Sequence, residues 1–324
     1  MPGFLWAILS ALAFSTEGLL ARAAAAGGGA VPPVLLLRYA VAVLALRAAE
    51  RLGAGGREEA APAPRSLRLE LVLSGVVGYA GTTLLLFASF ARLPTSLAIL
   101  LLYTYPVWVS LGAHWLGEER LTRRRVAALA VALAGTFLVA GASWAGGREW
   151  SAGVLLALAA ALSNTVQMLL VHRVIAAGTP PERAARLSVS WGLLALLAVA
   201  AWTGAALPGS GSMAWSWLRG GPGGWSAGAW WASLALGLVP TFVAILALAR
   251  SLERIGPART AILATSEPVF ALLWGVLLLG ERLAPSQLLG ALVLLAGLVW
   301  LVHGEPEASE AGDRAPRRAG SAAR

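Results

Sequence analysis

The chain has 324 residues, of which 58% are apolar and only 13% are charged, and its mean hydropathy is +0.74. So few charges cannot cover that much apolar surface in water, so the composition predicts an integral membrane protein. The chain has no cysteine, which excludes disulfides, thiolate catalysis and metal sites with sulfur ligands. The net charge of +9 does not indicate nucleic-acid binding, because the arginines lie in short loops beside apolar segments.

Ten apolar segments are long enough to cross a bilayer, since spanning ~30 Å of hydrocarbon takes about 20 helical residues. They lie at roughly 3–22, 32–49, 68–90, 95–116, 122–142, 151–172, 183–205, 227–249, 257–279 and 284–303. The first begins almost at Met1 and lacks a small-residue cleavage site, so we expect a retained helix and not a cleaved signal peptide. The composition of 305–324 changes to charged and small residues, which predicts a disordered tail.

The arginines predict the orientation of these helices. The loops after the second, fourth, sixth and eighth segments, together with the tail, hold 19 of them, whereas the opposite side holds 5. Because positively charged loops stay in the cytoplasm, both termini are expected to be cytoplasmic. All basic residues are arginine, and alanine, glycine and proline are abundant, which indicates a GC-rich bacterial genome. We therefore expect a multi-pass protein of the bacterial cytoplasmic (inner) membrane.

An internal duplication divides the chain. A shift of 162 positions superposes three features without a gap: Pro106 on Pro268, Glu119-Arg120-Leu121 on Glu281-Arg282-Leu283, and Gly135 on Gly297. A shift of 150 places Glu17 over Gln167. We expect one repeat at 1–145 and a second at 146–304, followed by the tail. Five helices per repeat is an odd number, so the second repeat must enter the membrane the other way up, as in many transporters.

Two similar motifs mark the repeats: Pro106…Gly117-Glu118-Glu119-Arg120-Leu121…Gly135 and Glu267-Pro268…Gly280-Glu281-Arg282-Leu283…Gly290…Gly297. They resemble the two EamA repeats of the drug/metabolite transporter superfamily, and the resemblance covers residues 3 to 304. It implies an all-α membrane fold of ten transmembrane helices in two inverted five-helix repeats, with cytoplasmic termini. It also implies transport of small metabolites, amino acids included. Tyr105 stands where the second repeat has Glu267, which argues against a mechanism that needs carboxylates in both halves.

Two ionisable residues lie inside the first two apolar segments. Glu17 is ~8 Å and Arg38 ~9 Å from the outer ends of their helices. Because consecutive helices run antiparallel, the two residues are expected at similar depths in the membrane. Charged side chains inside a membrane normally face a partner or a cavity. We therefore predict a Glu17–Arg38 pair at the outer part of a central cavity. The pair either exchanges partners with substrate or a proton, or is a static structural pair.

Prolines lie halfway along the fourth and ninth segments. Pro106 and Pro268 each remove a backbone donor and bend the helix, and the freed carbonyls are tolerated where they line a cavity. We predict two hinges beside a site, with Glu267 contacting a proton or the substrate. Alternatively, Glu267 and Ser266 merely satisfy the loosened backbone.

Other polar and aromatic residues lie on the same segments in both halves. The candidates for lining the cavity are Tyr79, Thr82, Tyr103, Asn164, Gln167 and Trp191. The alternative for each one alone is interhelical hydrogen bonding or packing, which is common in membrane bundles.

Several kinds of site are not expected. The histidines lie near helix ends without a second ligand at metal spacing, so we predict no metal. No phosphate-binding loop is visible, which excludes ATP hydrolysis as the driving force, and no cofactor is expected. No catalytic constellation is visible, so we predict that the protein is not an enzyme.

These features favour a secondary active transporter that works by alternating access. The leading hypothesis is an exporter of amino acids or related polar or amphipathic metabolites, with protons as a candidate coupling ion. A flippase for lipids or lipid-linked intermediates is the alternative in the same superfamily. A membrane-bound sensor or enzyme would need a catalytic set or a sizeable soluble domain. The sequence leaves open the substrate, the direction, the coupling ion and the choice between monomer and homodimer.

Overall fold

The structure is a computed structural model that describes residues 2–28, 31–53, 65–90, 92–93, 95–118, 121–140, 148–202, 225–279 and 284–302. These residues are almost entirely helical and include no strand, in agreement with the predicted all-α class. Among them, six helical stretches are long and apolar enough to span a membrane: Gly3–Ala26, Leu67–Ser89, Ser151–Ala176, Pro181–Trp202, Ala227–Ile255 and Pro257–Leu278. The other four predicted segments are also helical, and ten crossings remain a prediction. The predicted tail and the turn at 281–283 lie outside the described residues.

Five predicted segments form single α-helices. They are α3 (Val31–Gly53), α8 (Arg123–Ala140), α9 (Arg148–Ala176), α10 (Pro181–Trp202) and α16 (Pro285–Val302). Each is rich in leucine, alanine and valine, good formers of an apolar helix whose backbone groups are satisfied internally, as lipid requires.

Three predicted segments are each broken into two helices. They are α1 (Gly3–Phe14) with α2 (Glu17–Ala26), α6 (Thr95–Leu102) with α7 (Tyr105–Trp115), and α14 (Pro257–Ala264) with α15 (Glu267–Leu279). The last two breaks follow from the predicted proline bends. The first contradicts the expectation of one continuous helix at 3–22, and the break lies at Ser15 and Thr16.

Two further segments contain a stretch of wide π-helix. One runs through α4 (Arg65–Leu73), η1 (Ser74–Gly81) and α5 (Thr82–Phe90), and the other through α12 (Ala227–Gly237), η3 (Leu238–Val243) and α13 (Ala244–Ile255). Pro240 has no N–H to donate, so the regular ladder is interrupted in η3. The Thr241 hydroxyl instead donates to the carbonyl of Leu236, five residues earlier, at 2.7 Å. Single π turns of this kind often lie at functional sites.

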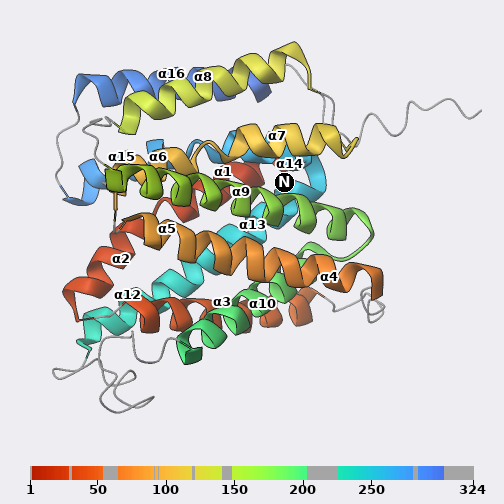
Figure 1. Cartoon of the computed structure of the whole chain (residues 1–324), viewed down its shortest axis with the longest axis vertical. Helices are drawn as coiled ribbons and strands as arrows, with labels where there is room; N and C mark the ends of the chain where they lie inside the picture. The colour runs from red at the N-terminus through yellow and green to blue at the C-terminus, as the bar shows by residue number, and fades with distance from the viewer. Residues whose placement is uncertain are drawn as a thin grey trace, which may run out of the picture.

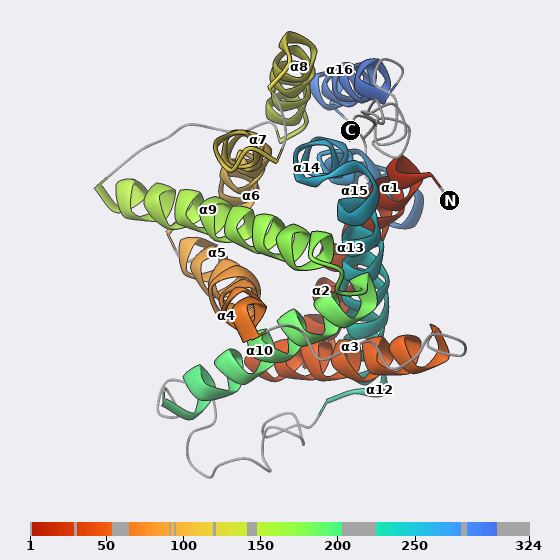
Figure 2. The same ribbon diagram turned by 90° about the vertical axis from the view of Figure 1, so that its right-hand side faces the viewer.

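The helices pack with a pseudo-twofold relation between the two halves (Figures 1 and 2). Helix α8 packs on α16 and α3 on α10, and both pairs join equivalent helices of the two repeats. Helix α7 packs on α14, which belongs to the equivalent broken segment of the second repeat. The first helix of each half packs on the third segment of the other, since α1 contacts α13 and α9 contacts η1 and α5. This exchange of partners is what the predicted duplication requires.

Glycines set the close approach of α8 and α16, which lie side by side at one edge of the molecule in both views. A Cβ on Gly135 would lie 2.6 Å from the Cβ of Leu294, and one on Gly297 would lie 2.8 Å from Cγ1 of Val131. Small residues that let backbones approach are the usual means of helix association in lipid. The paired glycines of the two repeats are therefore packing residues.

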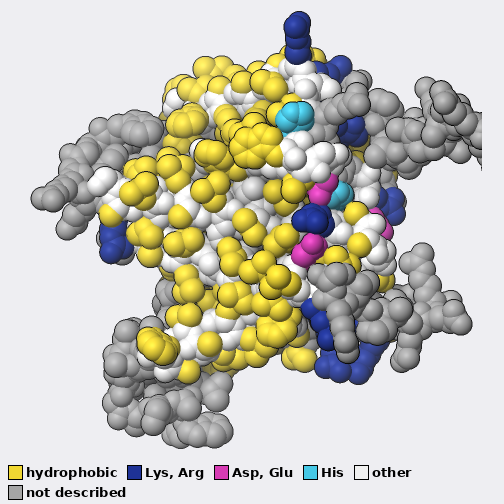
Figure 3. All heavy atoms as spheres, turned by 45° about the vertical axis from the view of Figure 1, so that its right-hand side comes forward, with side chains coloured by type: hydrophobic (Ala, Val, Ile, Leu, Met, Phe, Trp, Pro, Cys, Tyr) yellow, Lys and Arg dark blue, Asp and Glu magenta, His cyan; other side chains and the backbone are white. Residues whose placement is uncertain are grey.

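Charged side chains gather at one end of the molecule, whereas apolar side chains cover most of the remaining face (Figure 3). Glu50 at the end of α3 pairs with Arg186 near the start of α10 at 2.5 Å, and Glu70 of α4 pairs with Arg173 of α9 at 3.4 Å. Both pairs join the first half to the second. Within the second half, Glu182 pairs with Arg250 at 2.5 Å. We call the surface formed by these six residues the charged end.

Candidate functional site

Hydroxyl side chains cap the three helix breaks in the same way. Ser15 and Thr16 donate to the carbonyls of Leu12 and Ala13 at 2.6 and 2.8 Å. At the other two breaks the donors are likewise hydroxyls bonded three residues back, with distances of 2.6 to 2.8 Å: Thr104 to Leu101, Thr265 to Ile262, and Ser266 to Leu263. The backbone amides of Thr16, Thr104, Thr265 and Ser266 also bond to these carbonyls three residues back. Each of these four hydroxyls therefore adds a second hydrogen bond to the last turn before the break.

The residue after each break starts a new helix. Glu17 opens α2, Tyr105 opens α7 and Glu267 opens α15. Pro106 and Pro268 occupy the second helical position, where the missing N–H costs nothing. Both Glu17 and Glu267 are thus the first residue of the helix that follows a break. The hinge roles of the two prolines stay a prediction.

The three breaks lie together in space. Helix α1 contacts α14 and α15, and α14 contacts α7. The Trp274 indole of α15 donates to the Ser15 hydroxyl at 2.8 Å, and the Tyr105 hydroxyl donates to the carbonyl of Ala261 at 3.5 Å. Polar groups from three interrupted helices therefore converge on one region of the bundle.

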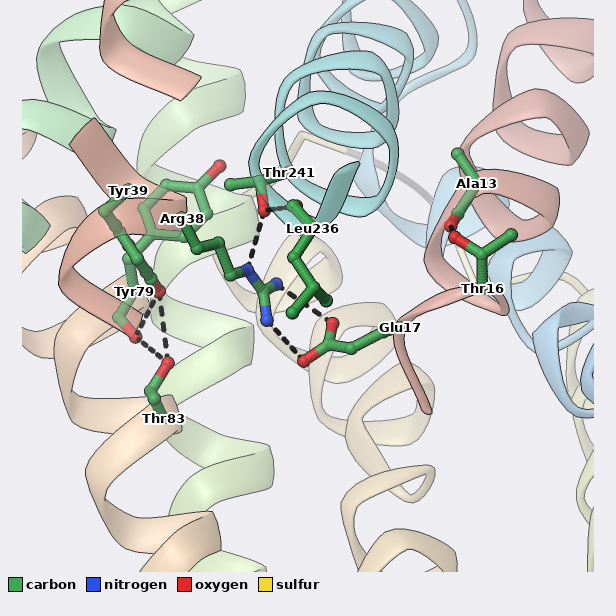
Figure 4. Close-up of polar contacts among 9 residues, drawn as sticks. All are labelled: Ala13, Thr16, Glu17, Arg38, Tyr39, Tyr79, Thr83, Leu236 and Thr241. Carbon is green, nitrogen blue, oxygen red and sulfur yellow. Dashed lines mark hydrogen bonds and ion pairs between the residues drawn. The ribbon is translucent and has the colours of Figure 1, made fainter. Parts of the chain in front are cut away.

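The predicted Glu17–Arg38 ion pair is present in this region (Figure 4). The two guanidinium NH2 groups of Arg38 donate to the two carboxylate oxygens of Glu17 at 2.5 and 2.9 Å. Its Nε donates to the hydroxyl of Thr241 at 2.6 Å. The Arg38 side chain is 11% exposed and that of Glu17 is 39% exposed. The buried Arg38 guanidinium therefore makes three hydrogen bonds, and the Glu17 carboxylate that neutralises it is partly exposed.

Tyrosines surround the pair. Tyr39 lies beside Arg38, whose guanidinium carbon is 5.9 Å from the ring centre. The Tyr39 hydroxyl contacts the Thr83 hydroxyl at 3.1 Å and donates to the carbonyl of Tyr79 at 3.4 Å (Figure 4). The Tyr79 side chain is in turn hydrogen-bonded to Gln167 of α9. This network connects α3, η1 and α9, and so joins both halves.

Glu267 interacts with the two tyrosines of the segment that contains α6 and α7. Its carboxylate accepts a hydrogen bond from Tyr103, which is buried at the break between α6 and α7. It is close enough to interact electrostatically with Glu17, Arg38 and Tyr105. We call the following residues the polar cluster: Glu17, Arg38, Tyr39, Tyr79, Tyr103, Tyr105, Thr241 and Glu267.

The remaining predicted residues lie outside these contacts. Thr82 donates to the carbonyl of Ala160 on α9 at 3.5 Å, which is an interhelical bond. Asn164 is half-buried on α9 and makes no side-chain hydrogen bond with any described residue. Trp191 is 39% exposed, and its Cβ lies against Gly75 of η1. Whether any of these contacts substrate stays a prediction.

Tyr39, Tyr105 and Thr241 are cluster members that the sequence prediction missed. Tyr39 follows Arg38 directly, and a polar neighbour of an intramembrane charge is a usable signal. Thr241 corresponds to Tyr79 at the shift of 162, so the duplication points to it once Tyr79 is a candidate. Within the described ranges, no group of three His, Asp or Glu side chains is placed to hold a metal ion.

Comparison with known proteins places the chain in a family. The EamA-like transporter family matches residues 1–141 and 151–303, which is nearly all of the described chain. The chain belongs to this family. This EamA-like transporter therefore carries two family repeats, and its membrane-spanning character and transport class agree with the sequence prediction. The repeat boundaries predicted at 145 and 146 are not tested by the match.

Structural comparison supports the same fold. One crystal structure superposes on this EamA-like transporter with a TM-score of 0.72 and 22% sequence identity, covering 93% of this chain and 96% of that one. At that identity the similarity shows the fold alone. No curated protein matches the chain.

Proposed function

We propose that this EamA-like transporter is a secondary active carrier that moves a small polar or amphipathic metabolite by alternating access. Amino acids and related compounds are the leading class, and export from the cell is the proposed direction. The observation that carries the proposal is the convergence of three broken helices on ionisable side chains. Irregular backbone at membrane depth occurs in transporters where it surrounds a substrate site.

The ion pairs of the charged end support alternating access. Glu50–Arg186 and Glu70–Arg173 join the two halves at one end of the bundle. A carrier that closes one side while the other opens needs contacts that form between halves in one state and separate in the next. Partly exposed ion pairs suit that use, because each is worth only about 0–1 kcal/mol and separates easily.

A proton gradient is the proposed driving force. Glu17 and Glu267 are carboxylates within membrane-spanning helices, and such groups commonly serve proton relays in transporters. The proposed location is the bacterial inner membrane with both termini in the cytoplasm, which places the charged end on the cytoplasmic side, where the arginine-rich loops lie.

The test is flux in proteoliposomes that contain the purified chain. With labelled amino acids outside, an acidic lumen should accelerate uptake, because protons leave as substrate enters. Glu17→Gln and Glu267→Gln should each reduce this acceleration, since a glutamine cannot carry the proton. Unchanged proton coupling in both variants would eliminate the proton proposal. Absence of saturable flux for every labelled amino acid would eliminate the proposed amino-acid carrier.

A further inference from the structure

The charges of the polar cluster do not balance. Arg38 donates from Nε to Thr241 and from both NH2 groups to Glu17, so the charges of Glu17 and Arg38 cancel. Glu267 makes no ion pair with any described residue. Its hydrogen-bond partner Tyr103 is a neutral phenol. When Glu267 is ionised, the cluster therefore carries one surplus negative charge.

A surplus charge inside a membrane protein is costly unless a partner neutralises it. Glu17 adds to the cost, because it is close enough to repel Glu267. Arg38 lies within electrostatic reach of Glu267, but among the described residues its three side-chain hydrogen bonds go to Thr241 and Glu17, and none goes to Glu267. A monovalent cation bound at Glu267 would restore neutrality without disturbing the Glu17–Arg38 pair.

The aromatic residues of the cluster point to the same ligand. The chain has only 4 tyrosines, and all of them belong to the polar cluster. Tyr103 and Tyr105 interact with Glu267, and Tyr39 and Tyr79 are bonded to each other beside Arg38. Tyrosine rings attract organic cations through their π faces, and the hydroxyls accept N–H hydrogen bonds. A carboxylate among tyrosines is suited to a protonated amine.

We infer that the substrate is recognised by a protonated amine, which binds Glu267 with Tyr103 and Tyr105, and that it carries a net charge of +1. The inference rests on the proposed carrier function and narrows its substrate class. A substrate carboxylate would have to displace Glu17 from Arg38. An amine should therefore bind more tightly than the amino acid that has the same side chain.

Four probes with one aromatic body separate the possibilities. They are phenethylammonium (a cation), phenylalanine (a zwitterion), 2-phenylethanol (neutral) and 3-phenylpropionate (an anion), each titrated calorimetrically into the purified full-length chain in detergent. We expect phenethylammonium to bind at least about tenfold more tightly than the other three, which corresponds to one good charge interaction. Equal binding of all four, a preference for phenylalanine or the anion, or no saturable binding of phenethylammonium would overturn the inference.

Variants locate the binding group. Glu267→Gln should weaken phenethylammonium binding by about tenfold or more, since it removes the charge and keeps the shape. Glu253→Gln is the matched control, because Glu253 is an exposed carboxylate of α13 outside the cluster. Tyr103→Phe, which keeps the ring and removes the hydroxyl, should cause a smaller loss and is informative even if Glu267→Gln fails to fold. Unchanged affinity in both Glu267→Gln and Tyr103→Phe would overturn the assignment.

Exchange in proteoliposomes separates this inference from the proposed function. If the chain binds phenethylammonium with the expected selectivity but does not exchange it across the membrane, the carrier proposal fails and the amine site stands. If the chain exchanges phenylalanine or 3-phenylpropionate but not phenethylammonium, the carrier stands and the amine inference fails.

Discussion

Arg38 shows how a charge is kept inside this bundle. A guanidinium has five N–H donors, and burial is tolerated only when they find acceptors. Glu17 supplies the opposite charge and Thr241 supplies a neutral acceptor on the other half of the chain. Thr241 is fully buried and itself donates to Leu236. Its hydroxyl therefore links Arg38 to the π turn of η3.

The variant Thr241→Val tests this link. It keeps the shape of the side chain but leaves the Nε of Arg38 without its acceptor. An unsatisfied buried donor costs roughly 1–3 kcal/mol, so thermal unfolding of the detergent-solubilised chain should occur at a clearly lower temperature. Thr241→Ser keeps the hydroxyl and is the control, with a smaller loss. Equal unfolding temperatures for Thr241→Val and Thr241→Ser would show that the hydrogen bond contributes nothing.

The residue-scale site was only partly predictable. Glu17 and Arg38 could be paired because both are ionisable groups at matching depths in consecutive helices, and the structure has that pair. The contact with Thr241 could not be predicted, because an ideal α-helix through 238–243 directs its side chains differently from the π turn that is present. The Tyr103–Glu267 bond depends on how the broken segment α6–α7 packs against the broken segment α14–α15, which no local pattern contains.

Helix breaks are the elements that build the site. Those at Thr104 and Ser266 could be predicted from Pro106 and Pro268, since proline interrupts the hydrogen-bond ladder. The break at Ser15 and Thr16 has no proline, so apolar periodicity alone predicted one helix. A usable signal was present: Ser15-Thr16-Glu17-Gly18 has the same order of residue types as Thr265-Ser266-Glu267-Pro268. Two hydroxyl residues before a glutamate and a helix breaker mark both sites.

Removing one break should separate stability from function. The triple variant Thr265→Ala/Ser266→Ala/Pro268→Ala removes the hydroxyls that bond back to the preceding turn and restores a backbone donor. A proline inside a helix costs about 3 kcal/mol, so a continuous helix should form and stability should be retained or increased. The rejoined helix rotates Glu267 away from Tyr103, so binding of phenethylammonium and exchange should both be lost.

Pro285→Ala provides the control for this variant, because Pro285 starts α16 away from any break. It should leave unfolding temperature and exchange close to those of the unmodified chain. If the triple variant also kept full exchange, the broken helix would have no role in transport.

The whole molecule is two repeats that exchange partners. The all-α class and the duplication could be predicted from the sequence, because lipid restricts spanning segments to apolar helices and the repeated motifs keep one spacing. The ion pairs of the charged end could not be predicted individually. The distribution of arginines among the loops predicts which end of the bundle is positively charged. Partners such as Glu50 and Arg186 are 136 positions apart in the sequence, so their contact depends on helix packing.

The most direct test of alternating access is to cross-link the two halves at the charged end and to measure whether exchange stops. The chain has no native cysteine, so Glu50→Cys/Arg186→Cys introduces its only two thiols, one in each half. A short, reducible bifunctional methanethiosulfonate then ties α3 to α10 in the arrangement of the present structure. The control is Glu182→Cys/Arg250→Cys, because that pair ties α10 to α13 within one half.

Exchange of a transported probe is then measured in proteoliposomes before cross-linking, after cross-linking and after reduction. We expect the Glu50–Arg186 cross-link to stop exchange, reduction to restore it, and the control cross-link to leave most of it intact. Exchange that continues at its original rate through a fully cross-linked Glu50→Cys/Arg186→Cys chain would contradict movement of the two halves about a shared site.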